Sequence, residues 1–80
     1  MQTLQEYKCP CCGYKTLTSR GEYDICPVCF WEDDPFQDEC PDCAGGANDV
    51  DLVNAKKNFS SFGACEERFI KEVRKPLADE

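Results

Sequence analysis

The chain has 80 residues, and a folded chain of this length buries only about 60% of the surface that its unfolded form exposes. Leu, Ile, Val and Phe together number 15, about 19% of the residues, and the formal net charge is −7, a balance typical of chains that do not fold. These values exclude a large apolar core and a multidomain enzyme, so the eight cysteines are the obvious alternative source of stability.

The N-terminal part of the chain, about residues 5–31, is predicted to form a β-hairpin. The pattern indicates strands over 5–9, 14–18 and 23–25, with turns over 9–13 and 19–22. Pro10 stiffens the first turn, and Gly21 lies at the centre of the second. We therefore expect the strand over 14–18 to pair with the strand over 23–25. The Cys9/Cys12 pair would lie at the base of this hairpin, and the strand over 23–25 would lead directly into the Cys26/Cys29 pair.

The remainder of the chain is predicted to be an acidic loop followed by helices. Residues 32–50 contain two prolines and a Gly-Gly pair without periodicity, which is typical of a loop. Apolar residues recur at helical spacing over 52–62, with Asp51 as the N-cap and Gly63 as the terminating residue. A second short helix is predicted over 66–74. The sequence thus predicts a single small α+β domain spanning 1–80.

The cysteine spacing favours a metal site over a disulfide framework. Three pairs share a two-residue gap, namely Cys9/Cys12, Cys26/Cys29 and Cys40/Cys43, and a disulfide framework has no reason to repeat that gap. Gln2–Glu6 has neither a basic start nor an apolar run, so we expect no secretory signal, no membrane segment and a cytoplasmic location. Thiols there stay reduced unless a metal binds them.

The first two pairs have the spacing Cys-x2-Cys-x13-Cys-x2-Cys, a zinc-ribbon signature, and predict that Cys9, Cys12, Cys26 and Cys29 bind one metal. Because the chain has no histidine, the site consists of thiolates alone, which suits zinc or a single iron. Four protein ligands leave no open position for activating water, and the sequence carries no nucleophile motif. We therefore expect a structural site and no enzyme activity.

The other four cysteines leave alternatives open. Cys11, Cys40, Cys43 and Cys65 could form a second four-thiolate zinc site, or remain free or reversibly oxidised thiols. A third alternative is ligand exchange, in which Cys40 and Cys43 bind the metal together with Cys26 and Cys29 across the ten residues between the two pairs.

The aromatic residues and the charges bear on partners. We expect Phe30, Trp31, Phe59, Phe62 and Phe69 to form the small core, with Tyr7, Tyr14 and Phe36 helping the rings at 30–31 to cover the metal. Residues 1–55 hold eleven acids against three bases, whereas residues 56–75 hold six bases against three acids. Phosphate binding needs a basic surface, so nucleic acid is an unfavoured partner. The charge balance fits two alternatives better. The chain could bind another protein that has a basic surface, or its acidic and basic parts could contact each other.

Two stretches resemble the cysteine-rich CPCC family of small bacterial proteins. They are Tyr7-Lys8-Cys9-Pro10-Cys11-Cys12-Gly13-Tyr14 and Tyr23-Asp24-Ile25-Cys26-Pro27-Val28-Cys29-Phe30-Trp31-Glu32-Asp33-Asp34. Shorter matches continue to Pro76. The resemblance implies a zinc-ribbon or rubredoxin-like knuckle fold and no activity, and it does not extend to Cys40-Pro41-Asp42-Cys43.

The two knuckles are also similar to those of rubredoxins, in which Cys-x2-Cys-Gly-Tyr and Cys-Pro-x-Cys hold one iron, although rubredoxins separate their pairs by a longer stretch. The function that we expect is a structural zinc module that binds another protein. The alternatives are a rubredoxin-like iron electron carrier and a thiol-based metal or redox sensor.

Overall fold

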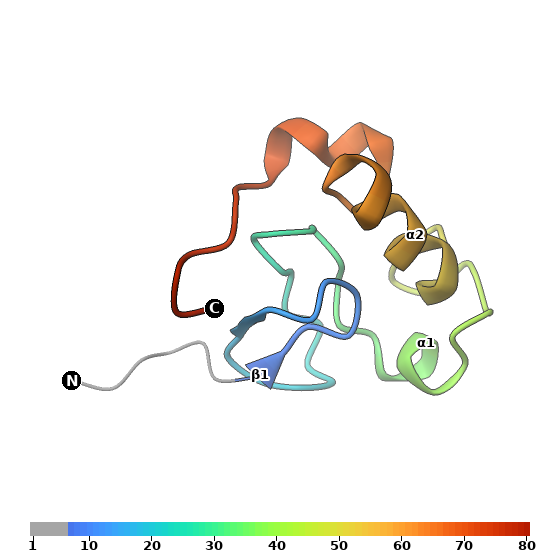
Figure 1. Ribbon diagram of the computed structural model, residues 1–80. Helices are drawn as coiled ribbons and strands as arrows, with labels where there is room; N and C mark the ends of the chain where they lie inside the picture. The colour runs from blue at the N-terminus through green and yellow to red at the C-terminus, as the bar shows by residue number, and fades with distance from the viewer. Residues whose placement is uncertain (1–6) are drawn as a thin grey trace.

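The computed structural model describes residues 7–80. Its elements, in chain order, are β1 (Tyr7–Lys8), β2 (Lys15–Leu17), α1 (Pro35–Glu39), α2 (Leu52–Phe62) and the 3₁₀ helix η1 (Glu67–Glu72). In Figure 1 α1 lies at one end of the fold and η1 at the other, with α2 between them and the small sheet beside them. This is the small α+β arrangement that the sequence predicts. No helix among the described residues is long and apolar enough to cross a membrane.

The predicted hairpin has the wrong strand pairing. β2 pairs antiparallel with β1, so that Leu17 faces Tyr7 across the first cysteine turn, and does not pair with residues 23–25. The predicted strand over 5–9 is therefore represented by β1, and its first two residues lie outside the described part of the chain.

Residues 23–25 instead pair with the segment that follows the second cysteine turn. Ile25 forms an antiparallel bridge with Glu32, and the Asp33 amide donates to the Asp24 carbonyl at 2.9 Å. The link between the two hairpins is held by a carboxylate, because Asp24 Oδ2 accepts from the Thr18 hydroxyl at 2.6 Å and from the Thr18 amide at 3.2 Å. Each cysteine pair thus has a hairpin of its own.

The acidic segment over 32–50 is more ordered than a loop. The Asp34 carboxylate accepts from the Phe36 amide at 2.8 Å and so caps α1. Behind α1 the fully buried Gln37 donates to the carbonyls of Asn48 and Val50 at 3.1 Å, and its Oε1 accepts from the Asn48 amide at 3.0 Å. These hydrogen bonds replace the apolar contacts that the segment lacks, which is why hydrophobic periodicity did not reveal it.

The helix predicted over 52–62 is α2, and its predicted caps are confirmed. The Asp51 side chain accepts from the Asn54 amide, and Gly63 ends the helix with φ +84°. Leu52 and Ala55 are buried, but Phe62 is 36% exposed and lies outside the core.

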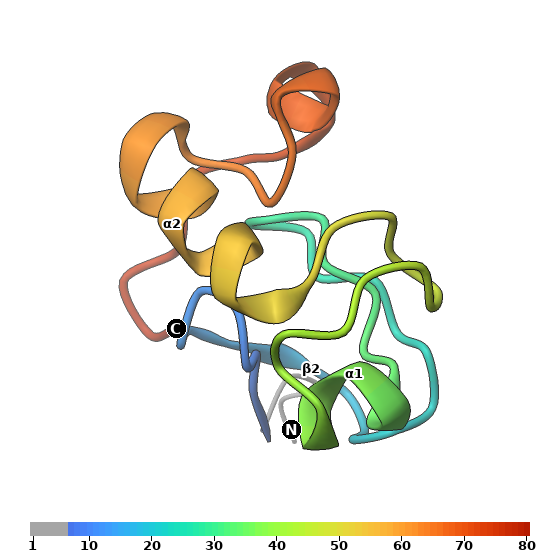
Figure 2. The same cartoon turned by 90° about the vertical axis from the view of Figure 1, so that its right-hand side faces the viewer.

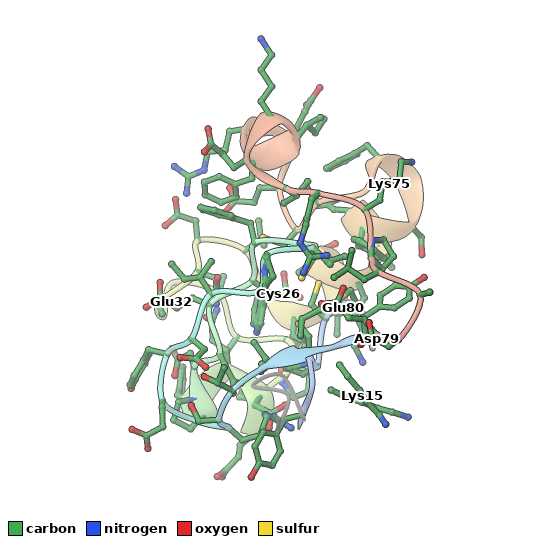
Figure 3. The ribbon with its side chains drawn as sticks, turned by 90° about the vertical axis from the view of Figure 1, so that its left-hand side faces the viewer. Lys15, Cys26, Glu32, Lys75, Asp79 and Glu80 are labelled. Carbon is green, nitrogen blue, oxygen red and sulfur yellow. A yellow bond between two sulfur atoms is a disulfide. The ribbon has the colours of Figure 1, made fainter. Side chains whose placement is uncertain are left out.

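The second short helix predicted over 66–74 is present as the 3₁₀ helix η1, which ends two residues earlier and is followed by an extended tail. Phe69 still packs on Phe30, with ring centroids 4.5 Å apart. The tail then folds back to the sheet, where the Glu80 carbonyl accepts from the Lys15 amide at 3.0 Å, as the labelled residues of Figure 3 indicate. The Glu80 carboxylate pairs with Arg74 at 2.8 Å.

Candidate metal centre

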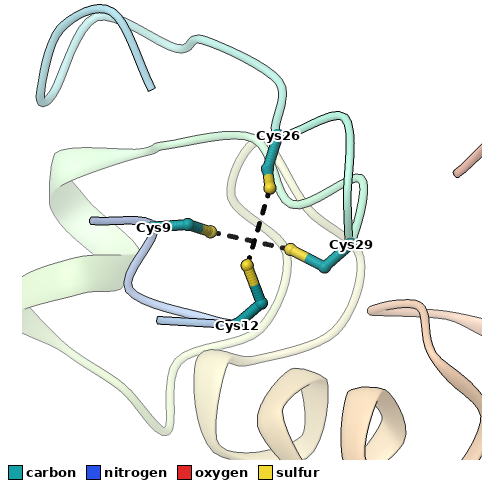
Figure 4. A group of neighbouring side chains, drawn as sticks. All are labelled: Cys9, Cys12, Cys26 and Cys29. Carbon is teal, nitrogen blue, oxygen red and sulfur yellow. Dashed lines mark hydrogen bonds between the residues drawn. The ribbon is translucent and has the colours of Figure 1, made fainter. Parts of the chain in front are cut away.

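The structure brings the four predicted ligands together (Figure 4). The sulfurs of Cys9, Cys12, Cys26 and Cys29 all lie within 4.8 Å of one another. The Cys9 and Cys29 sulfurs are 3.6 Å apart, and those of Cys12 and Cys26 are 3.7 Å apart. In a tetrahedron with metal–sulfur bonds of about 2.3 Å, the value for zinc, neighbouring sulfurs are separated by about 3.8 Å. The four thiols are therefore spaced to hold a single metal ion.

Two turns of the same design deliver these sulfurs. In the first, the Cys9 amide donates to the Tyr14 carbonyl at 2.9 Å, and the Gly13 amide donates to the Cys9 carbonyl at 2.8 Å. In the second, Cys26 makes the same two hydrogen bonds, to Trp31 at 2.9 Å and from Phe30 at 2.8 Å.

The residue after each second ligand adopts the left-handed conformation, with φ +80° at Gly13 and φ +71° at Phe30. Glycine adopts it at no cost, whereas a phenylalanine is strained there and needs surrounding contacts to hold it. The contact between Phe30 and Phe69 supplies one such restraint.

The site lies at the centre of the core. Cys9, Cys26 and Cys29 are at most 1% exposed, and Trp31 and Leu17 are equally buried beside them. Tyr14 packs against this cluster, but Tyr7 and Phe36 are 47% and 57% exposed, so the expectation that they help to cover the metal is wrong. The core of this chain is thus built largely around the sulfurs.

Cys26 has two further polar neighbours. Its sulfur lies 2.9 Å from the Thr16 hydroxyl and accepts from the Val28 amide at 3.4 Å. Hydrogen bonds of this kind orient a metal ligand and disperse its negative charge. Thr16 was not among the sequence candidates, and its place in the strand beyond the first turn is the only signal that could have indicated it.

The hydrogen bonds among the thiols set their protonation when no metal is bound. They lower the pKa of Cys26 far below the usual thiol range, first through Cys12. The pKa values of the other three are raised, chiefly by Cys12 for Cys9, by Cys26 for Cys12, and by Cys11 for Cys29. Because the ligand form of cysteine is the thiolate, binding of a divalent cation at this site would release the thiol protons.

Cys11 and Cys65 are free, buried thiols next to this site. The Cys65 amide donates to the Cys29 carbonyl at 2.8 Å, and burial raises the pKa of Cys65 to about 12. Neither sulfur belongs to the cluster formed by Cys9, Cys12, Cys26 and Cys29.

Cys40 and Cys43 form a disulfide at the end of α1, in a half-buried position. Among the described residues, their sulfurs cluster only with the Asp42 carboxylate, and neither Cys11 nor Cys65 joins them. The second four-thiolate site is therefore not assembled, because its four cysteines lie in two separate places and one pair is bonded to itself.

Comparison with known families agrees with this geometry. The family model described as cysteine-rich CPCC matches residues 7–80. The chain belongs to the cysteine-rich CPCC family. A search of curated proteins found no match. The CPCC segment that gives the family its name contains Cys9 and Cys12, which provide half of the four-sulfur cluster, and Cys11, which lies beside it.

Proposed function

We propose that this CPCC protein is a structural zinc module in which one zinc ion, bound by Cys9, Cys12, Cys26 and Cys29, holds the two hairpins together. The sulfur separations of 3.6 and 3.7 Å carry the proposal, because they match a closed tetrahedral site of zinc size. Such a site has no vacant position and supplies stability in place of chemistry. The surface around it would then serve to bind another protein in the cytoplasm.

The size of the zinc contribution supports a structural role. Zinc binding supplies about 10–16 kcal/mol in small finger peptides at neutral pH, which matches or exceeds the whole stability of a small domain. Only a few large aliphatic side chains are buried here, Leu17, Val28 and Leu52 among them, so the apolar core alone is thin.

The test is elemental analysis of the purified protein, followed by amide NMR before and after chelation under reducing conditions. The proposal predicts one zinc per chain and collapse of the dispersed spectrum when the metal is removed. A chelated, reduced sample that keeps its dispersed spectrum would contradict it. One iron per chain with a reversible one-electron couple would favour the rubredoxin-like electron carrier instead, since iron suits the same four thiolates.

The Cys40–Cys43 disulfide supports a second candidate function, a thiol-based redox sensor. Its half-buried position allows a small thiol to attack, and two equivalents of that thiol would reduce the bond to a dithiol while forming their own disulfide. Differential alkylation across a series of glutathione ratios, read by mass spectrometry, would measure the couple. A pair that stays oxidised or stays reduced over the whole series would eliminate this function.

A further inference from the structure

An open groove lies between α2, η1 and the segment that follows η1. Its volume is about 300 Å³, and its apolar walls include Phe59 and Phe62 from α2, Ile70 from η1 and Val73. Phe62 is 36% exposed and Ile70 is 42% exposed, in a chain that has few large apolar side chains to spare. Exposed apolar side chains gathered into a concave surface are typical of a binding site for another apolar side chain.

Two basic residues lie at the rim of the groove. Arg74 and Lys75 both line it, in the part of the chain where bases outnumber acids six to three. Arg74 is engaged by Glu80, but Lys75 makes no ion pair within residues 7–80. The groove therefore suits an apolar side chain that has acidic neighbours.

The metal centre shapes this groove. Val28, which lies between two of the metal ligands, forms part of its wall, and the Arg74 amide donates to the Pro27 carbonyl at 3.1 Å. The inference below thus rests on the proposed function, in which the bound metal holds this turn.

A surface of the opposite character lies on α1, and we refer to it as the Phe36 knob. The Phe36 ring is 57% exposed at the start of a helix that is capped by Asp34 and anchored by the buried Gln37, so the ring stands on a fixed support. Residues 32–42 contain six acids, two of which, Asp33 and Asp38, are paired with Arg20. Glu39 and Asp42 are exposed and make no ion pair within residues 7–80. The Phe36 knob is thus an apolar side chain with acidic neighbours, as the groove requires.

The knob and the groove of one molecule do not meet. α1 and η1 lie at opposite ends of the folded molecule in both Figure 1 and Figure 2. We propose that the Phe36 knob of one copy inserts into the groove of a second copy, so that the chains associate head to tail. Because each added copy leaves one knob and one groove free, this contact is open and the assembly grows with concentration.

The experiment is sedimentation equilibrium of the zinc-loaded protein from about 0.02 to about 2 mM, which brackets the weak dissociation constant of about 0.1–1 mM expected for one small contact. Salt of about 0.15 M keeps the Debye length near 8 Å, so that the net charge of −7 does not hold the copies apart. The average mass of the wild-type chain should rise from 9.1 kDa to at least twice that value.

Two single variants separate the halves of the contact. Phe36→Ser keeps the groove and loses the knob, whereas Phe62→Ser keeps the knob and loses part of the groove. Each should remain monomeric alone, yet their equimolar mixture should form a one-to-one complex. Val53→Ser, which alters an exposed apolar residue elsewhere on α2, should associate like the wild type. Lys75→Glu should weaken self-association at least tenfold and serves as the groove variant if Phe62→Ser fails to fold.

Three results would overturn the inference: a wild-type chain that is monomeric throughout, a Phe36→Ser chain that self-associates normally, or a mixture no heavier than its components. Metal content and amide spectra of the same samples separate this failure from that of the proposed function. A folded, zinc-loaded monomer refutes the head-to-tail contact alone.

Discussion

Replacing Gln37 with leucine should be among the most destabilising changes outside the metal ligands. The two hydrogens of the Gln37 side-chain nitrogen are shared among three carbonyls, those of Cys43, Asn48 and Val50, at 3.0–3.1 Å. Its oxygen accepts from the amide and the side-chain nitrogen of Asn48 at 3.0 and 2.9 Å. Leucine has a similar size but can satisfy none of these groups, and Gln37 is fully buried.

The expected loss of stability follows from the number of buried polar groups that would lose their hydrogen-bond partner. A buried donor or acceptor left without a partner costs about 1–3 kcal/mol, and water entering the opened segment recovers part of this cost. We therefore expect Gln37→Leu to lower the free energy of unfolding by about 3–5 kcal/mol. The network touches the metal turns only beyond the second one, where Asn48 bonds to Glu32, so the four sulfurs should keep their zinc.

The assay is urea unfolding at a fixed free zinc concentration, because zinc binding is linked to folding and its activity must be constant. Glu39→Gln, on the exposed side of the same helix, is the matched control and should change the free energy of unfolding by less than about 0.5 kcal/mol. If Gln37→Leu also changes the free energy of unfolding by less than about 0.5 kcal/mol, the polar network does not hold the acidic segment, and the reasoning is wrong.

Four further predictions concern the surroundings of the sulfurs and the tight turns. Gly13→Ala should cost about 1–2 kcal/mol in urea unfolding for its left-handed backbone alone, since its new Cβ meets nothing within 4 Å. Gly46→Ala should cost more, because its Cβ would lie 2.5 Å from an Asp34 oxygen, and an equal or smaller loss would contradict this. Thr16→Val should weaken zinc binding about 10–100-fold in a chelator competition, because it removes the hydroxyl beside Cys26. Ser60→Ala, at an exposed position on α2, is the control and should leave zinc binding unchanged. Cys65→Ser should retain one metal per chain by native mass spectrometry, and loss of the metal would make Cys65 a ligand.

The metal ligands and α2 could be predicted because each depends on residues close together in the sequence. A two-residue gap between cysteines places two sulfurs on one turn without reference to the rest of the chain. Asp51 and Gly63 likewise act on the backbone within a few residues of themselves, and both cap α2 as predicted.

The strand pairing and the acidic segment could not be predicted, because they depend on contacts between distant residues. Gly21 in a polar stretch is typical of a hairpin turn, yet Asp33 reaches back to accept from its amide at 2.7 Å and draws the chain into a different link. In the sequence Gln37 lies in a stretch typical of a loop. Its hydrogen-bond partners at 43, 48 and 50 become its neighbours only in the folded chain. Hydrophobic periodicity carries no information about such polar contacts.

X-ray absorption at the zinc edge of the purified, reduced protein tests the central claim most directly. The account predicts one zinc per chain with four sulfur neighbours at about 2.3 Å, and loss of this signal together with the fold in Cys26→Ser. A zinc shell containing oxygen or nitrogen, or fewer than four sulfurs, would contradict the assignment of Cys9, Cys12, Cys26 and Cys29 as a closed structural site.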